Sequence, residues 1–199
     1  MTQQRFLGWS QDGLWLGEAI RTTERGQGSL VRLELSTRTA TSTLEVATDS
    51  DGRPRELKAT LRFSGVRRGL IARRTSDGLS VSSEGEVVSA PRTVAWGDES
   101  GLEAGHPLLW GPLAARAPST GRAALRVVRV DPRIPSGVEI DHFVLERRGQ
   151  DGQGHRIWVE TRRGPVALWV NEKGEVVRAR WSRDGEPEEW RAATATYSE

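Results

Sequence analysis

Turn signals that combine an acidic residue or Asn with glycine recur along the chain and limit the folds open to it. Asp-Gly occurs five times in 199 residues, at Asp12-Gly13, Asp51-Gly52, Asp77-Gly78, Asp151-Gly152 and Asp184-Gly185. Residues 171–174, Asn-Glu-Lys-Gly, form a sixth signal of hairpin type. Asp, Asn and Gly tolerate the positive φ that tight hairpins require, so each signal is a candidate strand reversal. The sequence therefore predicts a chain of hairpins.

Between these turns, apolar and polar residues alternate with a period of two. The three clearest apolar rows are Val31, Leu33 and Leu35; Leu57, Ala59, Leu61 and Phe63; and Val138, Ile140, His142 and Val144. Such alternation is typical of antiparallel strands with one face buried and the other in water. About ten to fourteen strands at a spacing of 8–12 residues predict an all-β barrel, roll or sandwich.

The segment 96–120 interrupts the alternation. Its glycines and prolines, which a regular strand does not tolerate, are Gly97, Gly101, Gly105, Gly111, Pro107, Pro112 and Pro118. The segment also contains Leu102, Leu108, Leu109, Trp110 and Leu113. Burying one such side chain contributes about 1.5–3 kcal/mol, so we expect the segment to dock on the sheet as a plug or lid. Leu108, Leu109 and Trp110 should insert into the open side of the sheet, and Gly111-Pro112 limits any helix there to one or two turns.

We expect one all-β domain over residues 1–199. Its antiparallel sheet should be strongly curved, as a half-barrel or spiral β-roll, with segment 96–120 as the single short helical or irregular plug. Residues 1–95 and 121–199 are candidate halves. Residues 43–55 and 167–178 share the plan of strand, acidic Gly turn and strand, which leaves duplication of the halves as one alternative.

Composition excludes several classes of protein. The chain has no cysteine, so disulfides, thiolate zinc sites and cysteine nucleophiles are absent. The net charge is +2, and arginine pairs such as Arg67-Arg68 and Arg147-Arg148 are scattered among acids, so we do not expect a nucleic-acid partner. A transmembrane helix needs about 20 apolar residues, which no stretch provides. No signal peptide is readable, which predicts a cytoplasmic protein, and an envelope location stays open for a chain whose leader has been removed.

Catalytic and metal-binding motifs are also missing. The chain has three histidines, His106, His142 and His155, at spacings that do not suit a zinc site, and we expect no metal or cofactor. His142 lies on an apolar row, which predicts a core or pocket-wall residue. No nucleophile elbow or phosphate-binding loop is present, so we assign no catalytic residue. A hydrolase that uses Asp98, Glu99 and His106 remains a third reading.

Eight tryptophans stand against a total of four phenylalanines and tyrosines. Their large apolar rings suit core packing or a pocket wall, and they can also stack on bases. Trp158 and Trp169 are out of phase with the aliphatic residues beside them. Both faces of their strands are therefore covered, or one face lines a cavity.

Residues 107–181 resemble uncharacterised bacterial β-proteins related to the LolA-type lipoprotein carriers and to glycolipid-binding proteins. The resemblance is carried by residues 121–132, 144–149, 157–160 and 168–178, the last of which is a strand with tryptophan, an acidic Gly turn and a return strand. It implies a curved antiparallel sheet around an apolar cavity. The chain departs from the carriers in lacking a readable export signal and a lipobox cysteine. The resemblance implies no catalytic residues.

These observations favour a non-enzymatic protein that binds an apolar or amphipathic ligand, such as a lipid or glycolipid, in the concave face of the sheet. The candidate wall residues are Leu109, Trp110, His142, Trp158, Trp169 and Trp181. The alternative is a structural or partner-binding β-module without a small ligand, for example a homodimer joined through an exposed sheet edge.

Overall fold

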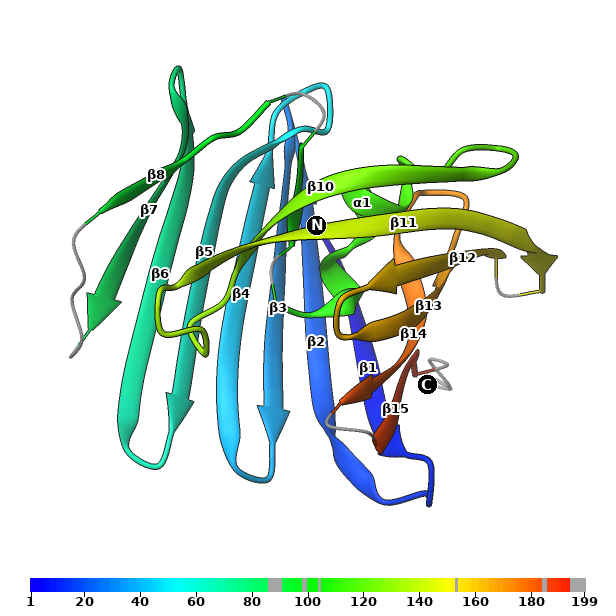
Figure 1. Cartoon of the computed structure of the whole chain (residues 1–199). Helices are drawn as coiled ribbons and strands as arrows, with labels where there is room; N and C mark the ends of the chain where they lie inside the picture. The colour runs from blue at the N-terminus through cyan, green and yellow to red at the C-terminus, as the bar shows by residue number, and fades with distance from the viewer. Residues whose placement is uncertain (86–90, 98–99, 104, 153, 184–185, 194–199) are drawn as a thin grey trace.

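The computed structural model describes residues 1–85, 91–97, 100–103, 105–152, 154–183 and 186–193. They form one curved, open sheet of 15 strands with a 3-10 turn and a single short helix (Figure 1). The prediction of an all-β fold with a strongly curved sheet is confirmed. The sheet has more strands than the predicted ten to fourteen because it includes two short edge strands, β8 and β9.

The first eight strands, which we call the N-terminal wing, form an antiparallel meander. They are β1 (Thr2–Ser10), β2 (Trp15–Arg25), β3 (Ser29–Thr37), β4 (Ala40–Thr48), β5 (Pro54–Phe63), β6 (Val66–Thr75), β7 (Gly78–Gly85) and β8 (Arg92–Val94). Predicted Asp-Gly turns lie between β1 and β2, β4 and β5, and β6 and β7. Gly13 and Gly52 have φ of 78° and 76°, the conformation that selects glycine in these turns.

The other seven strands form the C-terminal wing. They are β9 (Ser100–Glu103), β10 (Arg122–Val130), β11 (Val138–Asp151), β12 (Gly154–Thr161), β13 (Gly164–Val170), β14 (Val176–Arg183) and β15 (Glu186–Ala192). All pair antiparallel with their neighbours except β9, which runs parallel to β10. The turns at Asp151-Gly152 and residues 171–174 separate strands as predicted, whereas Asp184-Gly185 lies outside the described residues.

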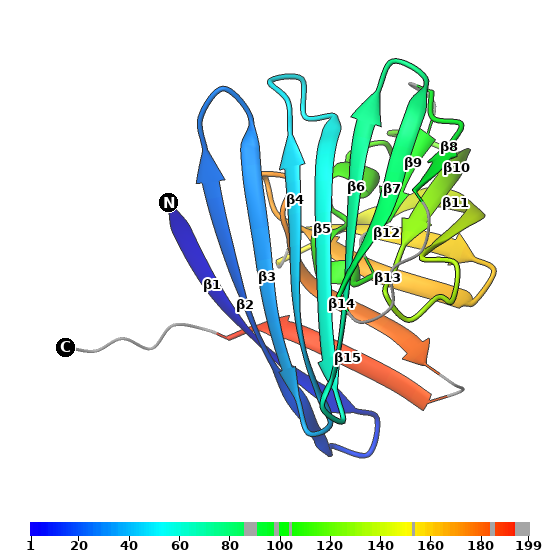
Figure 2. The ribbon, with the colours of Figure 1, turned by 90° about the vertical axis from the view of Figure 1, so that its left-hand side faces the viewer.

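The two wings are joined by the pairing of β1 with β15. Gly8 lies opposite Trp190 in this pair, and a Cβ at residue 8 would lie 2.5 Å from the Trp190 ring. Glycine is therefore needed where the indole crosses β1. Away from this junction the wings face each other: β10 and β11 pass in front of β4 and β5 in Figure 1, and the C-terminal wing lies behind the N-terminal wing in Figure 2. One continuous apolar core includes residues of both wings.

Two of the three predicted apolar rows face this core, and the third does not. Leu33 and Leu57 are fully buried, as their rows predict. On β11, however, the buried residues are Asp141, Phe143 and Leu145, while Ile140 is 41% exposed. Apolar residues occupy both faces of β11, and the face that carries the Phe143 ring is the one that packs inward. The predicted inward direction of the row is therefore wrong for Ile140 and His142, whereas Val138 packs against the core.

The segment between β8 and β10 docks inside the curve of the sheet. It contains η1 (Pro107–Leu109) and α1 (Gly111–Ala114), the one or two helical turns expected. Leu108, Leu109 and Trp110 are buried, which confirms the predicted docking. The prediction that no regular strand occurs in this segment is wrong, because Ser100–Glu103 form β9. Gly101 allows close packing there, since a Cβ would lie 2.4 Å from Leu113 Cδ2.

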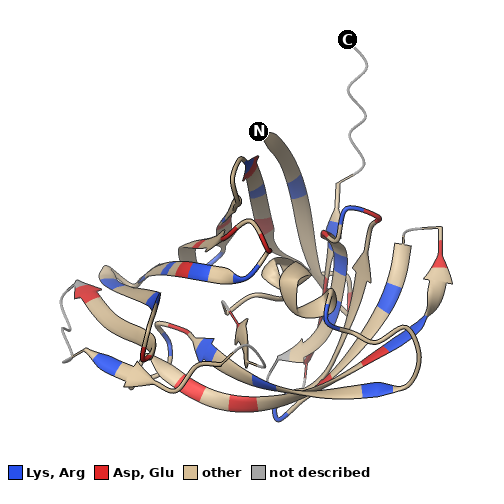
Figure 3. Cartoon of the chain, turned by 90° about the horizontal axis from the view of Figure 1, so that it is seen from above, with Lys and Arg blue, Asp and Glu red and all other residues tan. Residues whose placement is uncertain are grey.

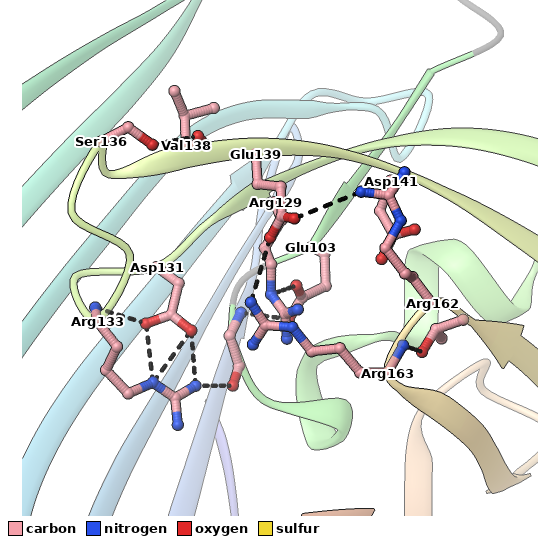
Figure 4. Close-up of polar contacts among 12 residues, drawn as sticks. Glu103, Arg129, Asp131, Arg133, Ser136, Val138, Glu139, Asp141, Arg162 and Arg163 are labelled. Carbon is pink, nitrogen blue, oxygen red and sulfur yellow. Dashed lines mark hydrogen bonds and ion pairs between the residues drawn. The ribbon is translucent and has the colours of Figure 1, made fainter.

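A buried ion pair holds β9 against β10. The Glu103 carboxylate lies 2.5 Å from Arg129 Nε, and its other oxygen accepts a hydrogen bond of 2.7 Å from the Gly105 amide. Close by, Arg133 binds the Asp131 carboxylate and the Gly105 carbonyl (Figure 4). Burial raises the pKa of Glu103 to about 7, although the Arg129 charge acts in the opposite direction. The native protein therefore takes up a proton at Glu103 near neutral pH.

This raised pKa predicts that stability falls as pH rises. Between its ordinary pKa of 4.5 and about 7, Glu103 is ionised in the unfolded chain but protonated in the native protein. Unfolding then releases a proton, so the free energy of unfolding should decrease by about 3 kcal/mol over this window. Urea unfolding at a series of pH values measures the decrease. Glu103→Gln should remove this decrease with pH. Glu146→Gln, which changes an ion pair on the outer face, is the control and should retain the decrease. If Glu103→Gln retained the decrease, the effect would not come from Glu103.

The position of Trp110 predicts a large loss of stability on truncation. Its ring centroid lies 5.1 Å from that of Phe143, and 4% of the residue is exposed. Trp110→Ala should lower the free energy of unfolding by about 3–5 kcal/mol, because it leaves a cavity in the core. Chemical denaturation gives this value. Trp15→Ala, at a site that is 44% exposed, is the control and should change stability by less than about 1 kcal/mol. Equal effects of the two substitutions would contradict a core role for Trp110.

Candidate functional site

A cleft of about 490 Å³ lies between the N-terminal wing, the docked segment and the turn between β13 and β14. Its size falls in the range of about 300–1,000 Å³ that is usual for small-molecule sites. Apolar lining comes from Val31, Trp96, Leu102, Leu108, Leu109, Leu113 and Val176. Seen from above, the sheet curves around the short helix (Figure 3). The cleft is thus a concave site with a largely apolar floor.

Glycine positions one wall of the cleft. A Cβ at Gly111 would lie 2.6 Å from the Gly174 carbonyl oxygen, so only glycine lets α1 begin this close to the turn between β13 and β14. Leu108 and Leu109 precede α1 in η1, which contacts β3 of the N-terminal wing, and both line the cleft. The docked segment both fills the core and forms one side of the cleft.

A buried arginine ties three elements together beside the floor. Arg21 is 4% exposed, and its guanidinium donates hydrogen bonds to the carbonyl oxygens of Val176, at 2.6 Å, and Leu108, at 3.4 Å. It also donates to Gln4 Oε1 at 2.6 Å and lies 3.5 Å from the Glu175 carboxylate. Burial lowers the pKa of Arg21, and Glu175 partly offsets this effect. Arginine remains charged even so, because its ordinary pKa is so high.

Sequence reasoning missed Arg21, although a local signal exists. Ala19, Arg21 and Thr23 share one face of β2, and all three are buried. An arginine on the inward row of an alternating strand is unusual, because buried charges need partners. The partners themselves could not be found from the sequence, since Val176 lies 155 residues further along the chain.

Charged side chains surround the apolar floor. Among the described residues that line the cleft, the cations are Arg21, Arg25, Arg53, Arg74, Arg116 and Lys173, and the acids are Asp51 and Glu175. Arg74 pairs with Asp49 at 2.8 Å, and hydrogen bonds from the Arg53 amide and from Arg74 hold the pKa of Asp49 below its usual range. Elsewhere on the strands, basic and acidic residues are interspersed (Figure 3). Cations therefore outnumber acids among the described lining residues.

The structure separates the six predicted wall residues. Leu109 lines the cleft. Trp110 and Trp181 are buried and border a different hollow, of about 590 Å³, together with Glu103 and Arg129. His142 is exposed on the outer face of β11, so its expected place in the core or a pocket wall is wrong. Its strand carries apolar residues on both faces, as described for Ile140.

Trp158 and Trp169 also lie outside the cleft, on the outer face of the C-terminal wing. The Arg148 guanidinium lies over the Trp158 ring at 4.4 Å, and that of Arg178 lies over the Trp169 ring at 4.1 Å. The Trp169 indole N–H donates a 2.8 Å hydrogen bond to Asp151. Of the two alternatives for these strands, covered faces or a cavity, the first holds at both tryptophans, where arginine side chains cover the outer face. Cation–π contact explains why tryptophan is stable there.

His106 has a structural position. Its Nδ1 accepts a hydrogen bond from the Leu108 amide, and its ring lies edge-on to Trp181 and Trp190 at 5.2 and 5.3 Å. Asp98 and Glu99, its proposed hydrolase partners, lie outside the described residues. Within the described ranges, no three His, Asp or Glu side chains are grouped as a metal site would require. Among the described residues, no helix has both the length and the apolar character that crossing a membrane requires.

Comparison with known proteins concerns the fold. Neither a known family model nor a curated protein matches the chain. Among solved structures, the chain is similar to the crystal structure of a DUF1089 family protein from Pseudomonas aeruginosa, with a TM-score of 0.54, over 80% of this chain and 87% of that chain. The sequences are 13% identical, so the likeness shows a shared β-fold alone. It carries no information about activity and shows no relation to the LolA-type carriers.

Proposed function

We propose that this protein is a non-enzymatic binding protein that holds an apolar or amphipathic ligand, such as a lipid or glycolipid, in the cleft. The observation that carries the proposal is the apolar floor formed by Val31, Leu109 and their neighbours in an open cleft. Apolar surface left in water is unfavourable by about 25 cal/mol per Å², so an apolar ligand gains free energy by covering the floor. A relation to the LolA-type carriers is part of this proposal.

The alternative function, a β-module that dimerises through an exposed sheet edge, has less support. The two edge strands are β8, with three residues, and β9, with four. All four residues of β9 are buried. Short edge strands are one way in which proteins avoid edge-to-edge pairing. The cleft is therefore the better-supported candidate.

Filling the cleft should abolish binding. Val31 is partly buried and lines the cleft from β3, so Val31→Trp places a large ring in the space of the ligand. Fluorescence titration with N-phenyl-1-naphthylamine, a neutral apolar probe, measures binding. We expect the parent protein to bind the probe and Val31→Trp to bind it at least about tenfold more weakly, since the contacts with the floor are lost.

Leu30→Trp is the matched control, because the adjacent residue points to the opposite face of β3. It should bind the probe as the parent protein does, with a similar unfolding transition. Failure of the parent protein to bind the probe, or equal binding by Val31→Trp, would contradict the proposed function. Native mass spectrometry of the freshly purified protein should also show a co-purified lipid.

A further inference from the structure

We propose that the ligand carries an acidic headgroup, a phosphate or a carboxylate, and that Arg21, Arg25 and Lys173 recognise it at the mouth of the cleft. This inference rests on the proposed function and names the chemical class of its ligand. The three cations line both the cleft and a neighbouring groove beside β1. Side chains shared by two adjoining hollows lie at the opening between them.

Among the described residues that line both hollows, three are cations and one, Glu175, is an acid. The Glu175 carboxylate lies 3.5 Å from Arg21 and 3.2 Å from Arg25. It also accepts a 3.3 Å hydrogen bond from the Asn171 side chain. Three positive charges and one negative charge therefore meet here, which leaves a local excess of positive charge. A ligand anion would balance this excess.

Because Arg21 is buried, its positive charge interacts strongly with a ligand anion. Arg21 is held by carbonyl groups and Gln4, so its position is fixed before any ligand arrives. Charges interact more strongly away from water, where the effective dielectric constant is low. Arg25 is 60% exposed on the solvent side, so its guanidinium can turn toward an incoming anion. The cluster thus combines a fixed charge with an adjustable one.

The charged mouth adjoins the apolar floor directly. Leu108 and Val176, whose carbonyl groups bind Arg21, both contribute to the lining of the cleft. One molecule can therefore place an apolar chain on the floor and an anion beside Arg21. Neutral and cationic amphiphiles have the same apolar alkyl chain but no anion to balance the excess positive charge. The geometry favours an anionic amphiphile over either.

Competition between amphiphiles with the same alkyl chain and different headgroups tests this preference for an anionic headgroup. Dodecyl phosphate, dodecyl maltoside and dodecyltrimethylammonium, each below its micelle concentration, are titrated against bound N-phenyl-1-naphthylamine. We expect dodecyl phosphate to displace the probe about tenfold more strongly than dodecyl maltoside, since a hydrogen bond to a charged group is worth about one power of ten or more. Inorganic phosphate should not displace the probe; displacement by phosphate alone would overturn the assignment to an amphiphile.

The double variant Arg25→Gln with Lys173→Gln should reduce the ratio of dodecyl phosphate to dodecyl maltoside affinity from about ten to about one. Lys58→Gln is the control, because Lys58 is the other lysine in the chain and pairs with Glu56 on the outer face. It should keep the ratio of the parent protein. Equal affinity of the parent for all three amphiphiles would overturn the headgroup inference and leave the proposed function standing. Absence of probe binding would contradict the proposed function itself.

Discussion

The structure depends on covering the concave face of an open sheet. Strands from both wings direct apolar side chains inward, and an uncovered face of this kind would be unstable in water. Leu108, Leu109 and Trp110 cover part of it from a segment that lies between the wings in the chain. Because a short 3-10 turn and a single helical turn cannot cover the whole face, a cleft remains beside them.

Charged side chains make different contacts on the outer faces of the strands and on the concave face. On the outer faces, arginines pair with acids or lie over tryptophan rings, as at Trp158 and Trp169. Such exposed contacts contribute little individually, but they keep both faces of the strands covered. Two of the buried ionic sites, those of Arg21 and Glu103, link separate elements. Arg21 links β2 to η1 and β14, and Glu103 links β9 to β10. Each therefore fixes one residue of the docked segment, Leu108 or Glu103.

These inward ions also connect the fold to the proposed binding activity. Arg21 binds the carbonyl groups of Leu108 and Val176 in the floor of the cleft, and its charge lies next to that floor. An interaction that stabilises the fold can therefore also select the ligand. The fold similarity to the DUF1089 family protein concerns the sheet and does not extend to these side chains.

The sequence by itself determined the strands, most of the turns and the docking of the central segment. Local rules suffice for these features, since positive φ selects Gly at reversals, as at Gly13 and Gly52, and a period of two marks a strand. The tertiary structure decided which face of a two-sided strand points inward, and so where His142, Trp158 and Trp169 lie. It also decided that Ser100–Glu103 pair with β10 and that Arg21 meets Glu175. Contacts between distant residues leave no local pattern, because they form only when the two wings fold onto the same core.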